Sequence, residues 1–142
     1  MPEEVWISDQ EDDPTIVSVL EGLTGFNEEE VGVAKSTALV AKLMADDGEP
    51  LRAGLVGYTA WGWLFIEKLW VAADLRGRGW AEKLLAAAES EALDRGCERA
   101  WLDTFNPQAK LLYERLGYRV FGELPNFVAL RTRYFMKKRL LV

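Results

Sequence analysis

The stretch Arg76-Gly77-Arg78-Gly79-Trp80-Ala81 is the part of this sequence that says most about its fold. It follows an apolar segment that ends near Val71 and precedes a segment with helical spacing of apolar residues. Glycine lets the backbone pass close to a ligand, and the free N–H groups at a helix start point toward it. The helix dipole and two arginines add positive potential, so the stretch predicts a site for a phosphate or pyrophosphate. A glycine-rich turn with solvated arginines is the alternative that the stretch alone leaves open.

Two familiar phosphate motifs do not fit this stretch. A P-loop needs Gly-x-x-x-x-Gly-Lys-Ser/Thr, and the sequence contains no such string. The dinucleotide fingerprint needs a third glycine three residues after Gly79, where Glu82 stands, and it expects an early strand. A nucleotide-binding protein that uses this turn in another way stays an open alternative.

Apolar runs and turn residues divide the chain into alternating elements. The predicted strands are residues 5–8, 37–44, 52–61, 64–71, 98–104, 118–124 and 132–140. The predicted helices start at Asp13-Pro14 and end at Gly22 or Gly25, run from 80 to 95 up to Gly96, and run from Asn106-Pro107 to 116 before Gly117.

The order of these elements predicts an α/β fold with a mixed sheet. Asp47-Gly48 and Trp61-Gly62-Trp63 predict hairpin connections, so three strands form a meander before the central helix. On that helix Ala81, Leu84, Leu85, Ala88 and Ala92 recur on one face, which is expected to pack against the sheet. The basic residues near the C-terminus are expected on the solvated side of a terminal strand.

Size and composition set the broad class. A chain of 142 residues with 49% hydrophobic and 28% charged residues predicts one globular domain over residues 1–142. No apolar run approaches the roughly 20 residues that span a bilayer, and the acidic N-terminus is unlike a signal peptide. We therefore expect a cytoplasmic protein without a membrane partner. The net charge of −6 argues against nucleic acid as a partner.

The chain has no histidine and a single cysteine, Cys97. This excludes an intramolecular disulfide, Ser-His-Asp and Cys-His mechanisms, and the commonest metal ligand, so no metal is expected. Cys97 is expected to be a small apolar residue entering a strand. The six tryptophans are expected mostly in the core, although Trp61 and Trp63 at a hairpin tip also suit the border of an acceptor pocket.

Two sequence blocks resemble the GNAT N-acetyltransferases. Arg76, Gly79 and Ala81 match the family signature Arg/Gln-x-x-Gly-x-Gly/Ala. The later block Asn106-Pro-Gln-Ala-Lys-Leu-Leu-Tyr-Glu-Arg-Leu-Gly-Tyr118 is similar to the family's Asn-x-x-Ala-x-x-Leu-Tyr-Glu-x-x-Gly-Phe. The chain is also similar to a narrower group of small bacterial GNAT proteins. It departs from that group at residues 127–131, where the group tends to have a loop with proline, glycine and histidine.

The resemblance implies a sheet that splays between its fourth and fifth strands and holds acetyl-CoA, the co-substrate, in the cleft. The backbone of Leu69, Trp70 and Val71 would pair with the pantetheine amides like an added strand. The N–H groups of Arg76, Gly77, Arg78, Gly79, Trp80 and Ala81 would hold the pyrophosphate. Asn106 and Ala109 would lie along the pantetheine and the thiol end.

The resemblance also implies the catalytic groups. Tyr113 occupies the position of the family's acid near the coenzyme sulfur, and packing of the short helix is its alternative role. Glu67 occupies the position of a base or water-holding carboxylate, and it interrupts an apolar strand where burying a charge is costly. An exposed edge position or a salt bridge is the alternative for Glu67. Asp103 is the reserve base.

The predicted activity is direct transfer of an acetyl group from acetyl-CoA to a primary amine of a small molecule, or of a protein or peptide. The alternative is a non-catalytic acyl-CoA-binding regulatory module. A homodimer is compatible with the family and with the apolar terminal strand.

Overall fold

The computed structural model describes residues 3–43, 48 and 50–140. Its elements are α1 (Thr15–Val31), β1 (Thr37–Lys42), β2 (Ala53–Ala60), β3 (Trp63–Val71), a 3-10 turn η1 (Ala73–Leu75), α2 (Trp80–Asp94), β4 (Arg99–Thr104), α3 (Pro107–Arg115), β5 (Arg119–Val128) and β6 (Arg131–Arg139). The chain forms two compact units, residues 1–34 and 35–142. Each unit is described by itself, and one domain over residues 1–142 stays a prediction.

The first unit consists of an extended segment and α1. The Asp13 carboxylate accepts the N–H of Thr15 at 2.9 Å, which matches the predicted helix start. The predicted end at Gly22 or Gly25 is wrong, because the helix continues to Val31 and ends at Gly32 (φ 90°). A glycine inside a helix costs only about 1 kcal/mol relative to alanine, so it does not by itself end a helix.

The predicted strand at residues 5–8 is also wrong. These residues have no regular secondary structure. A strand needs a neighbour that accepts and donates its backbone hydrogen bonds, and three apolar residues followed by a serine do not specify one.

The second unit is a six-stranded mixed sheet in the order β1-β2-β3-β4-β6-β5. Neighbouring strands are antiparallel except β3 and β4, which are parallel. The predicted meander is confirmed for β1 to β3, and Trp61-Gly62 forms its tight turn with positive φ at both residues. Asp47 of the other predicted turn lies outside the described residues.

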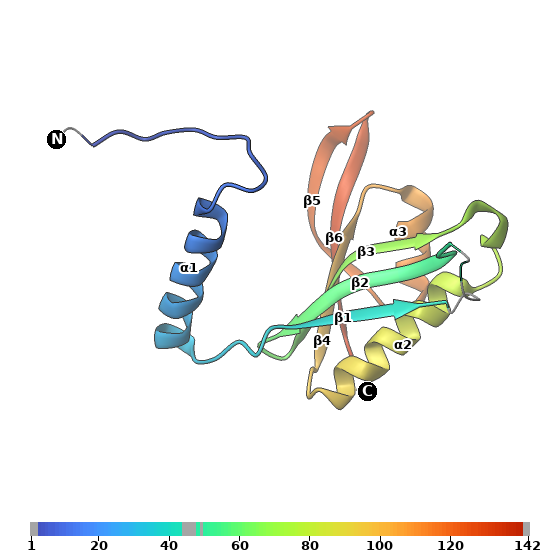
Figure 1. Cartoon of the computed structure of the whole chain (residues 1–142). Helices are drawn as coiled ribbons and strands as arrows, with labels where there is room; N and C mark the ends of the chain where they lie inside the picture. The colour runs from blue at the N-terminus through green and yellow to red at the C-terminus, as the bar shows by residue number, and fades with distance from the viewer. Residues whose placement is uncertain (1–2, 44–47, 49, 141–142) are drawn as a thin grey trace. The chain divides into compact units, whose positions relative to one another are not determined.

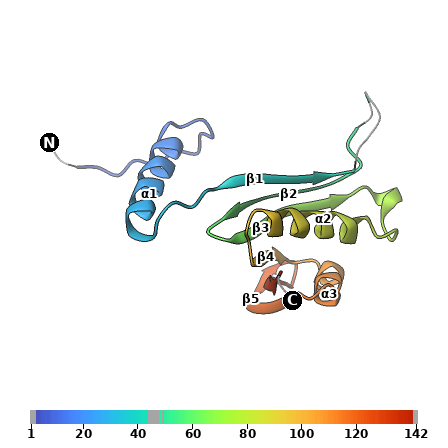
Figure 2. The same ribbon diagram turned by 90° about the horizontal axis from the view of Figure 1, so that it is seen from below.

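Helix α2 packs against β1, β2 and β3 on one face of the sheet, as Figures 1 and 2 show. Its buried residues Leu84, Leu85, Ala88 and Ala92 belong to the predicted apolar face. Together with buried strand residues such as Leu55, Leu64, Leu102 and Met136 they form the core. Cys97 is buried just before β4, as predicted.

The C-terminal hairpin differs from the prediction. Strand β5 extends to Val128, and the turn at Ala129-Leu130 has positive φ at both residues, so residues 127–131 form a hairpin tip rather than a long loop. Strand β6 lies between β4 and β5 and is therefore not an edge strand. It does not offer the edge that a dimer through the terminal strand would use. Among the described residues, no helix is long and apolar enough to cross a membrane.

Candidate active site

The sheet splits between β3 and β4. The two strands pair over three residues only, Trp63↔Arg99, Leu64↔Ala100 and Phe65↔Trp101. Beyond Phe65 strand β3 pairs only with β2, while β4 continues along β6. The predicted splaying is thus confirmed, because the fourth and fifth predicted strands, residues 64–71 and 98–104, correspond to β3 and β4. The backbone of residues 66–71, which includes Leu69, Trp70 and Val71, presents an unpaired edge to the split.

The glycine turn lies at the end of this edge, between β3 and α2. Gly77 (φ 76°) and Gly79 (φ 82°) both take the left-handed conformation. A Cβ atom added at either residue would meet no atom within 4 Å. Glycine is therefore required by the backbone conformation rather than by crowding, and the space in front of the turn is open.

A cavity of about 390 Å³ lies at this turn. Six of the predicted coenzyme-binding residues line it: Val71, Arg76, Gly77, Gly79, Trp80 and Ala81. The predicted residues Leu69, Trp70, Arg78, Asn106, Ala109 and Tyr113 are not part of its lining. The structure therefore gathers most of the turn into one site. Arg78 belongs to the turn without lining the cavity, and the other residues lie along the split or at α3.

The charges around the cavity favour an anion. The first N–H groups of α2 have no partner within the helix and lie at its positive end. Arg76 and Arg115 bring two positive charges to the lining, and Glu82 brings one negative charge. The Arg76 Nε donates to the carbonyl oxygen of Val71 at 3.0 Å, so this side chain also fixes the turn to the end of β3.

Two lining residues, Leu112 and Arg115 of α3, were not predicted. Their spacing of three residues places them on one face of a helix. That spacing within the second sequence block was the available signal, but only the tertiary structure shows that the face meets the glycine turn.

Tyr113 is 8% exposed on α3 and packs edge-on to Tyr118, with 6.1 Å between the ring centroids. Its hydroxyl makes no hydrogen bond within the described part of the chain, where no buried side-chain oxygen lacks a partner. The hydroxyl therefore reaches accessible space while the ring is buried. Burial raises the pKa of the phenol above 10.0, and the charge of Asp103 raises it further. Tyr113 is thus a protonated donor at neutral pH.

Glu67 lies in a β-bulge. Ile66 pairs with Gly57 and Lys68 pairs with Val56, so Glu67 is the extra residue without a partner on β2. The bulge depends on Gly57, because a Cβ there would lie 2.1 Å from the carbonyl oxygen of Phe65. The bulge turns the Glu67 side chain to an exposed position, so the cost of burial expected from the sequence does not arise.

Asp103, the reserve base, is already paired. Both Nε and Nη2 of Arg133 contact its Oδ1, at 2.8 and 2.7 Å. Among the described residues Glu67 has no such ion pair. The two carboxylates therefore differ, and Glu67 is the one whose charge is not neutralised by a neighbouring arginine.

Asn106 and Ala109 form a hydrogen bond with each other at the start of α3. The Asn106 side chain accepts the N–H groups of Gln108 (2.9 Å) and Ala109 (3.4 Å), which makes Asn106 the N-cap. Its carbonyl oxygen is therefore occupied, and its amide NH2 group remains as a donor.

The expectation that most tryptophans are in the core is wrong. The buried core of the described residues contains no tryptophan. Trp63 and Trp101 are half-buried, and with Trp61 they line an aromatic pocket on the other face of the sheet. The sequence suggested Trp61 and Trp63 as the border of a pocket, and both line this one. The other lining residues were not predicted, because they come from separate strands.

Comparisons with known proteins identify the family. The model for the Acetyltransferase (GNAT) family matches residues 5–118. Acetyltransferase Atu2258 of Agrobacterium fabrum is 37% identical over 133 residues, which cover 94% of this chain and 96% of that protein. Blasticidin-S acetyltransferase of Streptomyces morookaense is 37% identical over 91 residues, 63% of this chain and 67% of that one.

A crystal structure of a putative acetyltransferase from Agrobacterium tumefaciens superposes with a TM-score of 0.91 at 36% identity, over 96% of this chain and 99% of that chain. By class, the protein is therefore an acyltransferase. More narrowly, the chain belongs to the GNAT family of acetyltransferases.

Proposed function

We propose that the protein transfers an acetyl group from acetyl-CoA directly to the primary amine of a small molecule. The observation that carries this proposal is the continuity between the split sheet and the glycine turn. The unpaired edge of residues 66–71 leads to the cavity that Arg76, Gly79 and Arg115 line. A long ligand with amide groups at one end and a pyrophosphate at the other would fit this edge and this cavity in the same order.

The residues present suit such a ligand. Backbone groups of Leu69, Trp70 and Val71 would pair with amides along the β3 edge. The N–H groups at the start of α2, with Arg115, would hold the pyrophosphate, and the free amide NH2 of Asn106 offers a donor on the α3 side. When bound, acetyl-CoA supplies an activated acetyl group as a thioester.

The protein's own residues handle two protons. Glu67, exposed in the bulge and without an ion pair, would take a proton from the acceptor ammonium or amine at its carboxylate. Tyr113, kept protonated by its raised pKa, would give its phenol proton to the departing sulfur. The bond that forms joins the amine nitrogen to the acetyl carbon, and the bond that breaks joins that carbon to sulfur.

Cys97 supports direct transfer rather than an acyl-enzyme. It is 3% exposed, and burial raises the pKa of its thiol. A buried protonated thiol is a poor nucleophile. The chain has no histidine that would activate a serine or a cysteine.

The small-molecule acceptor is supported by a relative that is named for acetylating blasticidin S. A cytoplasmic protein without nucleic-acid or membrane partners remains our proposal from composition and net charge.

We further propose a homodimer, as the resemblance to the family allows, although β6 is not an edge strand that it could use. Light scattering after size exclusion should give twice the chain mass. A monomeric wild type would exclude this proposal.

The coenzyme is tested by melting temperature. A hundredfold excess over Kd stabilises the folded protein by about 2.7 kcal/mol, which raises the melting temperature by roughly 5–10 °C. Gly79→Val should remove this increase. Gly96→Val is the matched control, because Gly96 also has a positive φ (88°) and open space around it but lies at the other end of α2. Equal stabilisation by ATP, or none by acetyl-CoA, would contradict the proposal.

Turnover separates the enzyme from a binding module. Thiol release should follow mixing of the protein, acetyl-CoA and a panel of primary amines. Tight binding of acetyl-CoA without thiol release from any amine would favour the regulatory module instead.

A further inference from the structure

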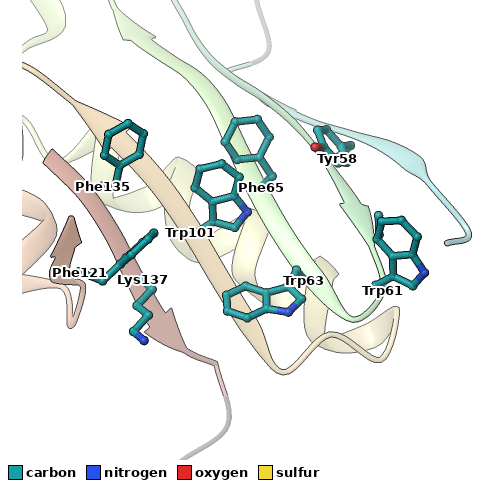
Figure 3. A pocket seen from close by; sticks show the side chains of 9 residues that line it. Tyr58, Trp61, Trp63, Phe65, Trp101, Phe121, Phe135 and Lys137 are labelled. Carbon is teal, nitrogen blue, oxygen red and sulfur yellow. The ribbon is translucent and has the colours of Figure 1, made fainter. Parts of the chain in front are cut away.

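An aromatic pocket of about 630 Å³ lies on the face of the sheet opposite α2. Leu64, Ile66 and Leu102 turn into the core that α2 covers, so the residues that alternate with them face the other side. Seven aromatic side chains line the pocket, and its single charged lining residue within the described chain is Lys137. Figure 3 shows Phe65 and Trp101 side by side at its centre.

The floor of this pocket lies at the point where the sheet splits. Phe65 and Trp101 are the last parallel pair of β3 and β4, and their rings stack with 4.1 Å between centroids. The carboxylates Glu67 and Asp103 follow two residues later on the same two strands. Residues i and i+2 of a strand share a face, and the bulge keeps Glu67 off the core face. The aromatic floor therefore continues directly to the proposed base.

We propose that this pocket receives the body of the acceptor, and that the acceptor is an amine joined by a short spacer to an aromatic ring. The inference rests on the proposed function, because it places the amine at Glu67. Two residues along a strand span about 6.6 Å. A spacer of about two carbons between ring and nitrogen matches this distance, as in an arylethylamine.

The residues that line the pocket favour an aromatic ring over other groups on the acceptor. Tyr58 packs edge-on to Phe65 at 5.3 Å, and Phe121 and Phe135 close the opposite side. Faces and edges of this kind attract a further ring in offset or edge-on geometry. The Nζ of Lys137 lies 5.6 Å from the ring centroid of Phe121, so a cation already stands at the rim. That charge disfavours a polyamine, whose second ammonium would lie beside it.

The first test compares acceptors. We expect kcat/KM for 2-phenylethylamine to exceed that for ethylamine by about 100-fold, because a pocket of this kind discriminates by the apolar surface it buries. 2-Cyclohexylethylamine should fall between them, and spermidine should be as poor as ethylamine. Equal kcat/KM values for all four amines would overturn the inference while leaving the acetyltransferase intact.

Two variants test whether the preference for an aromatic amine arises in this pocket. Trp101→Ala and Phe121→Ala should each lower the ratio of kcat/KM for 2-phenylethylamine to that for ethylamine about tenfold or more. Phe121 is 53% exposed, so its removal should not prevent folding. Phe127→Ala is the matched control, because Phe127 is 42% exposed on the same strand but does not line the pocket. An equal loss in Phe127→Ala would overturn the inference.

Binding gives a measurement that does not need turnover. Trp61, Trp63 and Trp101 line the pocket, so titration with 2-phenylethylamine should change the intrinsic fluorescence in a saturable way. Phe121→Ala should weaken this binding, whereas ethylamine should cause no change. If thiol release fails with every amine, the proposed function fails, and the titration still decides on the pocket. No saturable change in the wild type would overturn the inference.

Discussion

Replacing Tyr113 by phenylalanine separates a catalytic phenol from a packing residue. The substitution removes one hydroxyl that makes no hydrogen bond within the described residues, so no buried partner is left unpaired. The ring stays in place against Tyr118. We therefore expect the free energy of unfolding to change by no more than about 0.5 kcal/mol. Loss of a positioned general acid costs on the order of 10²–10⁴ in rate, or about 2.7–5.4 kcal/mol in the activation free energy.

Tyr118 provides the matched control. Its ring packs beside that of Tyr113, but its hydroxyl donates to the Glu89 carboxylate at 2.8 Å, which also accepts from Lys138 Nζ at 2.7 Å. A hydrogen bond to a charged group contributes about 1.5–3 kcal/mol to stability. Tyr118→Phe should therefore lower the melting temperature by roughly 5–10 °C and leave kcat near wild type.

The two variants should thus show opposite patterns. Thiol release measured at saturating acetyl-CoA and amine gives kcat, and urea unfolding gives the free energy of unfolding. Normal turnover in Tyr113→Phe would show that the residue only packs α3. A loss of stability in Tyr113→Phe as large as in Tyr118→Phe would show that the hydroxyl has a buried partner, contrary to the reasoning from the structure.

Three further predictions concern charge. Glu67→Gln should lower turnover most at neutral pH and recover partly at alkaline pH, where the amine deprotonates unaided; an unchanged pH profile would direct attention to Asp103. Arg115→Ala should weaken acetyl-CoA binding about tenfold, or about 1.4 kcal/mol, in calorimetric titration, and an unchanged Kd would remove Arg115 from the coenzyme site. Burial raises the pKa of both Tyr113 and Tyr118 above 10.0, so their stabilisation is present below pH 10 and is lost as the pH rises through the folded-state pKa. Urea unfolding between pH 8 and 11 should show this decline, and Tyr118→Phe should flatten it.

The parts of the fold that sequence reasoning predicted correctly are those with local causes. The helix face of Leu84, Leu85 and Ala88 follows from spacing alone, and the Trp61-Gly62 turn follows from a glycine between two apolar runs. The strand at residues 5–8 failed for the opposite reason. A strand exists only where a partner strand lies beside it, and short apolar runs do not specify that partner.

The candidate site divides in the same way. The glycine turn is a local motif that can be recognised in the sequence, and in the structure it lines a cavity. Its role in binding the coenzyme stays a prediction. The contribution of Arg115, the bulge at Glu67 and the aromatic pocket all depend on register between strands or on helix packing. Glu67 shows this best, because its exposure depends on Gly57, a residue ten positions earlier on another strand.

One structural feature connects the coenzyme edge and the aromatic pocket. All six residues of β4 pair with β6, and β3 pairs with β2 along its length apart from the bulge, so each strand has one satisfied edge. The three-residue contact between β3 and β4 then fixes where the rings of Phe65 and Trp101 stack and where the strands begin to separate. Past that point the backbone groups of residues 66–71 face the split without a strand partner. Such groups are costly to bury unless a ligand with its own amides pairs with them. A longer parallel pairing would satisfy them internally, close the split and remove the coenzyme edge, while the aromatic floor would remain.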